Sequence, residues 1–316
     1  MFSNKDLKRL LIPLIIEQLL MSLMGVADTI MVSNVSPAAI SAVSLVDTIN
    51  VLIIYFFSAL GTGGTIVCAQ YLGSGDIKAA KNSSSQLMLT VLSLSLAVTI
   101  LCFIFRRLLL QLIFGSVDDD VMADSVTYFS ITILSYPFIA LNNASAALYR
   151  AIGNSRLPML VSLETNILHI ILNLIFIFGF GMGVAGAALS TLISRIVGAA
   201  AMLWFQLKSG QVITIDNITA IRPDFFVMKL ILRIGIPTGI ENGFFQFGKL
   251  LVQSTVSTLG TVAISVQALT YTLELISSMP SIAIGLGLVT VVGQCMGAGR
   301  KDEARRYIIK LTKLAA

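Results

Sequence analysis

The sequence holds few of the residues that metal centres and disulfide scaffolds require. It has one histidine and three cysteines, Cys68, Cys102 and Cys295, all within apolar stretches and without CxxC spacing. This pattern argues against a zinc site or a disulfide framework, and it favours cysteines that pack as small apolar side chains. Charged residues make up only 12% of the chain, about half of their share in an ordinary soluble domain.

The features of nucleic-acid-binding proteins and of enzymes are missing as well. The net charge is +5, but the lysines and arginines are scattered over short loops, so we expect no nucleic-acid partner. The glycines at 61–64 and 285–287 lie inside apolar runs, without the strand-to-helix turn of a phosphate loop. Because the sequence shows no metal cluster and no nucleophile–base pair, we predict a protein that is not an enzyme and has no cofactor.

Long apolar runs dominate the chain. Apolar residues make up 56% of it, and the runs reach the length of about 20 residues that a helix needs to cross a bilayer. Strands of a membrane barrel are only about 10 residues long, so we predict an all-α, polytopic membrane protein embedded in the lipid bilayer. The eight predicted spans are residues 10–33, 42–71, 84–105, 125–147, 157–180, 184–207, 230–257 and 263–296. Pro137 and Pro280 fall in the middle of spans and predict kinks there.

The basic residues indicate the orientation in the membrane. Seventeen lysines and arginines lie in the connections on one side, and only Arg106 and Arg107 lie in those on the other. Such an excess marks the cytoplasmic side. We therefore expect a multi-pass protein of a prokaryotic inner membrane with its N-terminus in the cytoplasm.

The chain contains one long segment twice. A shift of 224 residues aligns residues 5–87 with 229–311 without a gap, and 22 of the 83 aligned positions are identical. Six spans separate the two copies, so both enter the membrane in the same direction and form parallel repeats around an axis along the membrane normal. The identical pairs include Pro13 with Pro237, Glu17 with Glu241, Gly61 with Gly285, Gly63 with Gly287, Gln70 with Gln294, Gly73 with Gly297 and Gly75 with Gly299.

The repeat also predicts the domain organisation. We expect a six-helix N-terminal lobe over residues 1–208, a cytoplasmic linker over residues 209–228, and an incomplete C-terminal lobe over residues 229–316. The last part would hold two helices and the start of a third. Because residues after 87 have no second copy, we interpret the chain as truncated at its C-terminus, and we expect the full-length protein to be a monomer.

Several ionisable side chains lie within the predicted spans. Each costs about 2.5–3.5 kcal/mol in hydrocarbon on insertion scales, so each should face a cavity or a partner. Six acids against two bases give a net negative interior, which favours cations. Some of these groups, Glu164 and Arg195 among them, could instead form structural ion pairs. The full set is Glu17, Asp28, Asp47, Glu164, Glu241, Glu274, Arg195 and Lys249.

Three oxygen-bearing side chains share one depth. At 1.5 Å per residue, Asp28, Asn173 and Thr191 lie about 8 to 10 Å below the outer surface. Their carboxylate, carboxamide and hydroxyl oxygens would suit Na⁺, and the single carboxylate would also suit a proton. His169 lies one turn from Asn173 and is a candidate for coupling, with a packing role as the alternative.

The other charged residues predict a cavity or a gate. Glu17 shares a helix face with Asp28 about 16 Å away and is repeated as Glu241. These two acids could contact substrate or form a gate, or they could pack between helices, and Lys249 could be a counter-charge for Glu241 or Glu274. The predicted cavity or gate residues are Glu17, Asp47, Glu241, Lys249 and Glu274.

Several motifs in the chain are those of a known family. They are GVADTIMVS at 25–33, AQYLGSGD at 69–76, ALYRAIGNSRLPM at 147–159, LNLIFIFGFGMGVAGAALST at 172–191, RIGIPTGIENGFFQFGK at 233–249 and GQCMGAG at 293–299. With these motifs the chain resembles the multidrug and toxic compound extrusion (MATE) family over its whole length. With Asn173 the chain is more similar to the NorM-like branch. That branch has an asparagine at the position of His169, so the two differ there.

The resemblance implies a fold and a function. The fold would have twelve helices in two lobes arranged as a V. The function would be the export of small cationic or amphipathic compounds by antiport with Na⁺ or H⁺, with the cation site at Asp28, Asn173 and Thr191. The C-lobe glutamate of the family falls at Phe245, where Glu241, one turn earlier, could substitute. The alternative is a lipid-linked saccharide flippase of the same superfamily, but an anionic head group would require a basic cavity.

Overall fold

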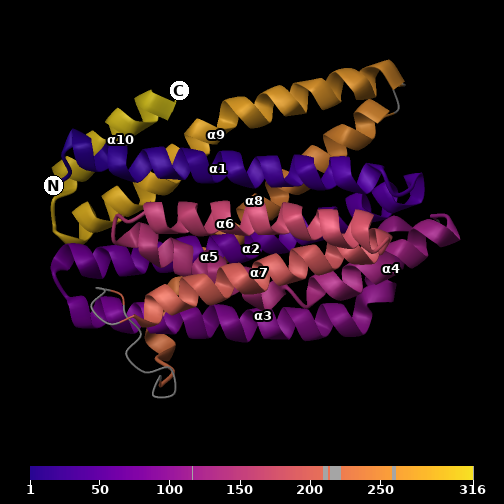
Figure 1. The fold of residues 1–316 in the computed structure, drawn as a ribbon. Coiled ribbons are helices and arrows are strands. Elements are labelled where there is room, and N and C mark those ends of the chain that lie inside the picture. The colour runs from indigo at the N-terminus through magenta and orange to yellow at the C-terminus, as the bar shows by residue number, and fades with distance from the viewer. Residues whose placement is uncertain (116, 209–212, 214–221, 258–260, 316) are drawn as a thin grey trace.

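The computed structural model describes residues 1–315 apart from residues 116, 209–212, 214–221 and 258–260. The described chain is almost wholly helical, and its long helices lie side by side (Figure 1). The elements are α1 (Asn4–Ser33), α2 (Pro37–Ser74), α3 (Ile77–Phe114), α4 (Asp119–Ile133), α5 (Tyr136–Ala151), α6 (Arg156–Asn173), the π-helix η1 (Leu174–Gly179), α7 (Gly183–Leu207), α8 (Phe225–Ser257), α9 (Thr261–Gly297) and α10 (Lys301–Ala315).

Local sequence explains where the first helices begin and end. Ser3 and Asp6 form a capping box at the start of α1, because the side chain of each accepts the backbone amide of the other. Ser36 caps α2, and Pro37 follows in the first turn. The first amides of a helix have no partner within the helix, so a proline, which lacks the amide hydrogen, loses no hydrogen bond there. The helix ends at Gly75, whose φ of 81° is a left-handed conformation that a glycine adopts without strain.

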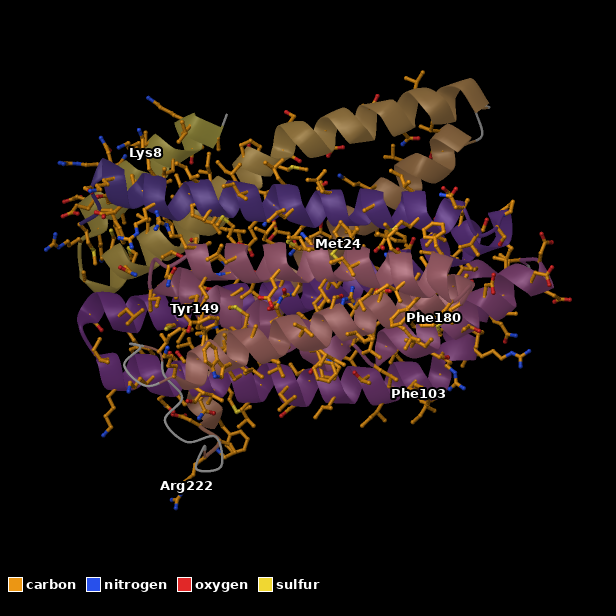
Figure 2. The ribbon with its side chains drawn as sticks, in the orientation of Figure 1. Lys8, Met24, Phe103, Tyr149, Phe180 and Arg222 are labelled. Atoms are coloured by element: carbon orange, nitrogen blue, oxygen red, sulfur yellow. The ribbon has the colours of Figure 1, made fainter. Side chains whose placement is uncertain are left out.

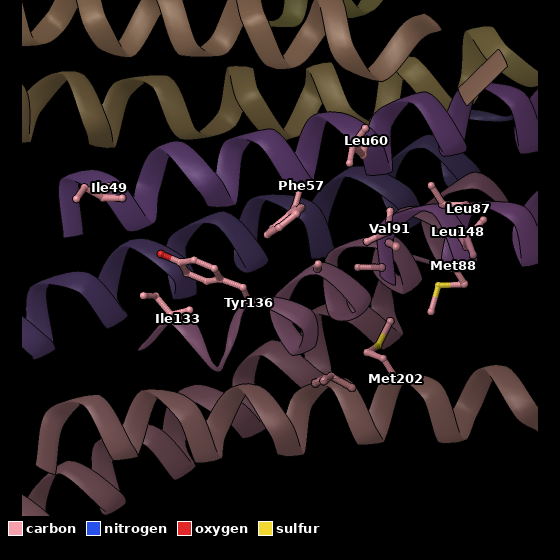
Figure 3. Packing of buried hydrophobic residues seen from close by; sticks show 14 of the residues in the cluster. Ile49, Phe57, Leu60, Leu87, Met88, Val91, Ile133, Tyr136, Leu148 and Met202 are labelled. Atoms are coloured by element: carbon pink, nitrogen blue, oxygen red, sulfur yellow. The ribbon is translucent and has the colours of Figure 1, made fainter. Parts of the chain in front are cut away.

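The first seven α-helices enclose the largest apolar core. Phe57 of α2, Tyr136 and Leu148 of α5 and Met202 of α7 are fully buried in it, and they meet between the helices (Figure 3). Large apolar side chains also point outward along the same helices, among them Ile104, Phe178 and Trp204, which are more than half exposed. A bundle that is apolar on its outside as well as its inside is suited to lipid.

Within the described residues, six helices are long and apolar enough to cross a membrane, or seven if α4 and α5 together form one span. This confirms the prediction of a polytopic, all-α membrane protein. The two helices of the pair meet at an angle of 48° next to Pro137, where a kink was predicted. The described part of α8 is not among the apolar spans, because polar residues such as Arg233, Glu241 and Gln246 interrupt it.

The repeat is visible in the helix boundaries. Both α1 and α8 end at a serine, at equivalent positions of the two copies, and α2 and α9 begin at equivalent positions. The turns after α2 and α9 also agree, because Gly75 and Gly299 have φ values of 81° and 73°. Figure 1 shows α8 and α9 lying beside α1 and α2. The fold therefore comprises a six-helix N-terminal lobe, in which α4 and α5 form one bent helix, followed by the first helices of a second lobe.

One end of the bundle is rich in basic residues. It carries the N-terminus with Lys5, Lys8 and Arg9, and α10 with Arg305 and Arg306, and it is called the basic end below. Lys8 lies at this end, whereas Phe103 and Phe180 lie toward the opposite end (Figure 2). In Figure 1, α8 and α9 approach the first lobe at the basic end and diverge from it toward the other.

A polar clasp attaches the start of α8 to α3. The buried side chain of Gln86 donates to the Arg222 carbonyl at 2.8 Å and accepts the Asp224 amide at 3.0 Å. Asn82 donates to the Asp224 carboxylate at 2.9 Å, and the same carboxylate accepts the amides of Phe226 and Val227. Most of the predicted linker, residues 209–228, lies outside the described residues, so its extent stays a prediction.

We expect this clasp to give the folded protein an acid-sensitive contact. The hydrogen bond from Asn82 lowers the pKa of Asp224 below its ordinary value of 3.8, so the contact is intact above that value and is lost as the pH falls through the lowered pKa. Asp224→Ala should therefore lower the melting temperature in detergent at neutral pH, and the difference from wild type should shrink as the pH falls to about 3.

Gln86→Ala provides the control for that measurement. It removes two bonds to the backbone but no ionisable group, and should cost about 0.5–1.5 kcal/mol for each partly buried hydrogen bond that is lost. Its effect should be the same at neutral and at acid pH. An Asp224→Ala effect that does not change with pH would contradict the assignment.

Candidate functional site

Four of the predicted site residues come together in the first lobe. Asp28 lies in the last third of α1, His169 and Asn173 lie one turn apart on α6, and Thr191 lies on α7. Asn173 and His169 are fully buried and Thr191 is 5% exposed, whereas 19% of the Asp28 side chain is exposed. The depth comparison along the spans therefore identified neighbours in space.

The Asp28 carboxylate is the centre of this site. Its Oδ1 accepts a hydrogen bond from Asn173 Nδ2 at 2.7 Å and lies 3.5 Å from His169 Nε2. The same His169 nitrogen is 3.2 Å from Thr191 Oγ1. Because the Thr191 hydroxyl donates to the Ala187 carbonyl at 3.0 Å, it accepts from His169, and this geometry assigns the proton of the neutral ring to Nε2.

Two buried polar atoms of the site lack a hydrogen-bond partner among the described residues. They are His169 Nδ1 and Asn173 Oδ1. Buried polar atoms are usually bonded, so such atoms point to a group that binds there. A half-turn of the Asn173 amide would exchange its nitrogen for its oxygen, and Asp28, Asn173 and Thr191 would then offer three oxygens to one cation. With the Asn173 amide turned in this way, the three residues fit a Na⁺ ion. Binding of a proton needs only the Asp28 carboxylate and no change at Asn173.

The backbone around Asn173 departs from a regular α-helix. Asn173 is the last residue of α6, and the chain continues directly into the π-helix η1. A π-turn holds one more residue than an α-turn and is frequent at functional sites. Here it begins at the residue after the Asp28 partner, so the side chains that follow leave the face of α6 that carries His169 and Asn173.

A second polar group lies beside the first. Asp47 Oδ1 accepts from Asn50 Nδ2 at 3.1 Å and from the Tyr128 hydroxyl at 3.4 Å, and the Tyr136 hydroxyl donates to Asn50 Oδ1 at 2.8 Å. Asp47 was predicted as a cavity or gate residue. The structure bonds it to Tyr128 of α4 and to Asn50 of its own helix, and its role in a cavity or gate stays a prediction.

Arg195 of α7 supplies the positive charge of this region. It donates to Ser135 Oγ at 2.7 Å and lies within electrostatic range of both Asp28 and Asp47. The sequence left open a structural ion pair for Glu164 and for Arg195. In the structure Glu164 is exposed on α6, and no ion pair joins the two among the described residues. Sequence analysis missed Arg195 as a site residue, although a charge inside an apolar helix was a signal that it needs a partner.

The remaining predicted residues lie elsewhere. Glu17 is buried and its Oε1 pairs with Arg150 Nη1 of α5 at 3.1 Å. Glu274 pairs with Lys249 at 2.8 Å, which agrees with the predicted counter-charge, and the Lys249 ammonium lies 5.1 Å from the centre of the Phe245 ring. Glu241 is exposed on α8. These groups do not join the site around Asp28.

An all-α, multi-pass fold built from a parallel repeat, with a half-buried carboxylate inside its spans, is typical of membrane transporters rather than enzymes. The MatE family model matches residues 13–175 and 237–316, and the chain belongs to this family. The resemblance to MATE transporters is thereby confirmed.

Individual relatives agree with the family. The chain is 29% identical over 311 residues to a probable multidrug resistance protein NorM of Thermotoga maritima, with 95% of this chain and 65% of the relative covered. It is also 29% identical to an uncharacterized transporter YisQ of Bacillus subtilis, with 94% and 66% covered. The multidrug export protein MepA of Staphylococcus aureus is 25% identical, with 95% and 67% covered. The chain thus spans about two thirds of the length of these relatives.

Solved structures show the same fold. A MATE crystal structure in a bent conformation superposes with a TM-score of 0.91 at 24% identity, over 99% of this chain and 69% of that one. A transporter of the MOP superfamily from Pyrococcus furiosus, described as having a binding pocket of reversed polarity, gives a TM-score of 0.91 at 24% identity, over 98% of this chain and 69% of its own.

We expect the Glu17–Arg150 pair to stabilise the first lobe. Glu17→Ala should lower the free energy of unfolding by about 3–5 kcal/mol, because it leaves a buried guanidinium without its counter-charge. Adding Arg150→Met should recover much of this loss, since it removes the unpaired charge and keeps an apolar stem. Denaturant titrations in detergent would measure both. A double variant no more stable than Glu17→Ala would contradict the pairing.

Proposed function

We propose that the protein is a secondary active exporter that moves small cationic or amphipathic molecules outward, coupled to inward movement of Na⁺ or H⁺. The observation that carries this proposal is the Asp28 carboxylate, which lies at membrane depth and is bonded only to neutral side chains. A carboxylate in such surroundings changes its interactions strongly when a cation or a proton arrives. The names of the Thermotoga and Staphylococcus relatives support a role in drug export.

The charges in the spans support a cationic substrate. Glu274 is neutralised by Lys249, and Arg195 balances Asp28 and Asp47. Glu164 and Glu241 are exposed acids on α6 and α8. An anionic lipid-linked saccharide would be repelled by such acids, so a flippase is the less favoured function.

We propose that the basic end faces the cytoplasm of a prokaryotic cell. The excess of lysine and arginine at this end supports that orientation. The Asp28 site then lies in the half of the membrane that is closer to the outside, where the inward-moving ion would enter.

Asp28→Asn should abolish coupled efflux while the protein remains folded and inserted. The amide keeps the size of the side chain but cannot carry the charge that a cation or proton neutralises. Efflux of a cationic dye from cells expressing the gene, with Na⁺ and pH gradients applied in turn, would measure this. Asp120→Asn, which changes an exposed carboxylate in the first turn of α4, is the matched control. Wild-type efflux by Asp28→Asn under both gradients would refute the assignment.

His169 and Thr191 should determine how coupling depends on the ion. His169→Asn replaces the ring with an amide that does not titrate near neutral pH, so the pH profile of efflux should change if His169 takes part in coupling. Thr191→Val removes one oxygen from the proposed cation set and should weaken Na⁺-driven efflux more than H⁺-driven efflux. Equal losses under both gradients would indicate that these residues only support the fold.

A further inference from the structure

The second lobe holds the end of α5 through two side chains of α9. Thr290 Oγ1 donates to the Arg150 carbonyl at 3.1 Å, and Gln294 Nε2 donates to the Ala151 carbonyl at 2.6 Å. The last carbonyls of a helix have no amide partner further along the same helix. The Ala151 carbonyl, at the end of α5, therefore obtains its bond from the opposite lobe.

Close backbone contacts surround these bonds. A methyl group added to Gly73 would overlap the Gln294 carbonyl, and one added to Gly297 would overlap the Gln70 carbonyl. Gly73 and Gly297 are repeat partners, and so are Gln70 and Gln294, so the same contact is made twice across the repeat axis. Glycine is required at both positions because the helix backbones α2 and α9 touch there.

The helices pack closely beside this contact. Thr62, Thr65 and Arg150 of the first lobe and Leu286 and Val289 of α9 line a cavity of about 10 Å³ there. Such a space admits about one water molecule and no organic substrate. Toward the opposite end α8 and α9 diverge from the first lobe (Figure 1), and Phe244 and Phe247 of α8 are 72% and 57% exposed.

Other contacts also join the lobes at this end. The partly buried Tyr307 hydroxyl bonds to the amide and the carbonyl of Phe2 at 2.9 and 2.8 Å, and apolar side chains of α1 pack against α9. Two further contacts lie in solvent. The N-terminal ammonium pairs with Glu303 at 2.6 Å, and Lys310 donates to Asn4 at 2.6 Å. Exposed contacts of this kind contribute little, because water and salt screen them. The bonds of Thr290 and Gln294 are partly buried, and they differ from the other contacts in joining α9 to the end of a helix of the first lobe.

We propose that Thr290 and Gln294 are positioning residues of the transport cycle, which latch α9 onto the end of α5 and hold the basic end closed. This rests on the proposed function, because the latch must open for substrate to enter from that side. Both bonds are between neutral groups and can be exchanged for bonds to water. The latch can therefore open and close without separating a buried ion pair.

Cys295 provides a probe of the latch. It is the residue after Gln294, is fully buried, and contacts Met1 across the lobes at 3.8 Å between the sulfur atoms. In a background where Cys295 is the only cysteine, a water-soluble maleimide should label it slowly in membrane vesicles. Gln294→Met and Thr290→Val keep the shapes of the side chains and remove the donors. Each should raise the labelling rate about three- to tenfold, as expected for the loss of one hydrogen bond.

Matched variants separate the latch from a general loosening of the fold. Gln70→Ala changes the exposed repeat partner of Gln294 and should label at the wild-type rate, and Thr290→Ser keeps the hydroxyl and should do the same. Gly297→Val should keep the end open and label fastest, whereas Gly285→Ala, where a methyl group has no neighbour within 4 Å, should change nothing.

Labelling and efflux together distinguish the two proposals. Faster labelling of Gln294→Met and Thr290→Val with reduced efflux would support both. Faster labelling in a protein that exports no cation even as wild type would support the latch and refute the proposed function. Wild-type labelling rates in Gln294→Met and Thr290→Val would overturn the latch, whatever the efflux.

Discussion

The absence of water inside a membrane is the constraint on which this structure depends. A polar group in hydrocarbon must find its partner within the protein, since leaving it unpaired costs several kcal/mol. The hydroxyls of Thr90 and Ser190 meet this need locally, because each donates to the carbonyl one turn earlier in its own helix. The carboxylates cannot do so. Asp28, Asp47 and Glu17 each collect donors from other helices, and these contacts determine how the helices are rotated.

The two acids of α1 show that similar residues can meet this constraint differently. Glu17 is paired with the guanidinium of Arg150, and this pair ties α1 to α5. Asp28 has the Asn173 amide and the His169 imidazole as neighbours, and the Thr191 hydroxyl lies beside the imidazole. The amide and the hydroxyl are neutral, and the imidazole can be neutral. The first arrangement is a structural link. The second lacks such an ion pair between α1 and its neighbours among the described residues, and this is the basis of the coupling role proposed for Asp28.

Sequence reasoning predicted the features that depend on the order and spacing of residues along the chain. Run length predicted the helices, the shift of 224 residues predicted the parallel repeat, and depth along the spans brought Asp28, Asn173 and Thr191 together. It could not predict rotation about the helix axes. That is why Tyr128 was not considered as a partner of Asp47, since their contact depends on which faces of α2 and α4 point inward. The π-helix after Asn173 has no signature in its apolar sequence either.

The close approach of Gly73 and Gly297 to the backbone of the opposite helix also bears on how the two copies could diverge after duplication. A clash between two side chains can be relieved by a smaller residue on the partner. A clash between a side chain and a backbone carbonyl cannot, because every residue has that carbonyl. Neither copy can therefore compensate for a larger residue at a glycine of the other. This restriction does not apply to a side chain such as Asp28, and the equivalent position of the second copy is Val252. Paired glycines of this kind are the positions where an ancient duplication stays recognisable after the side chains around them have changed.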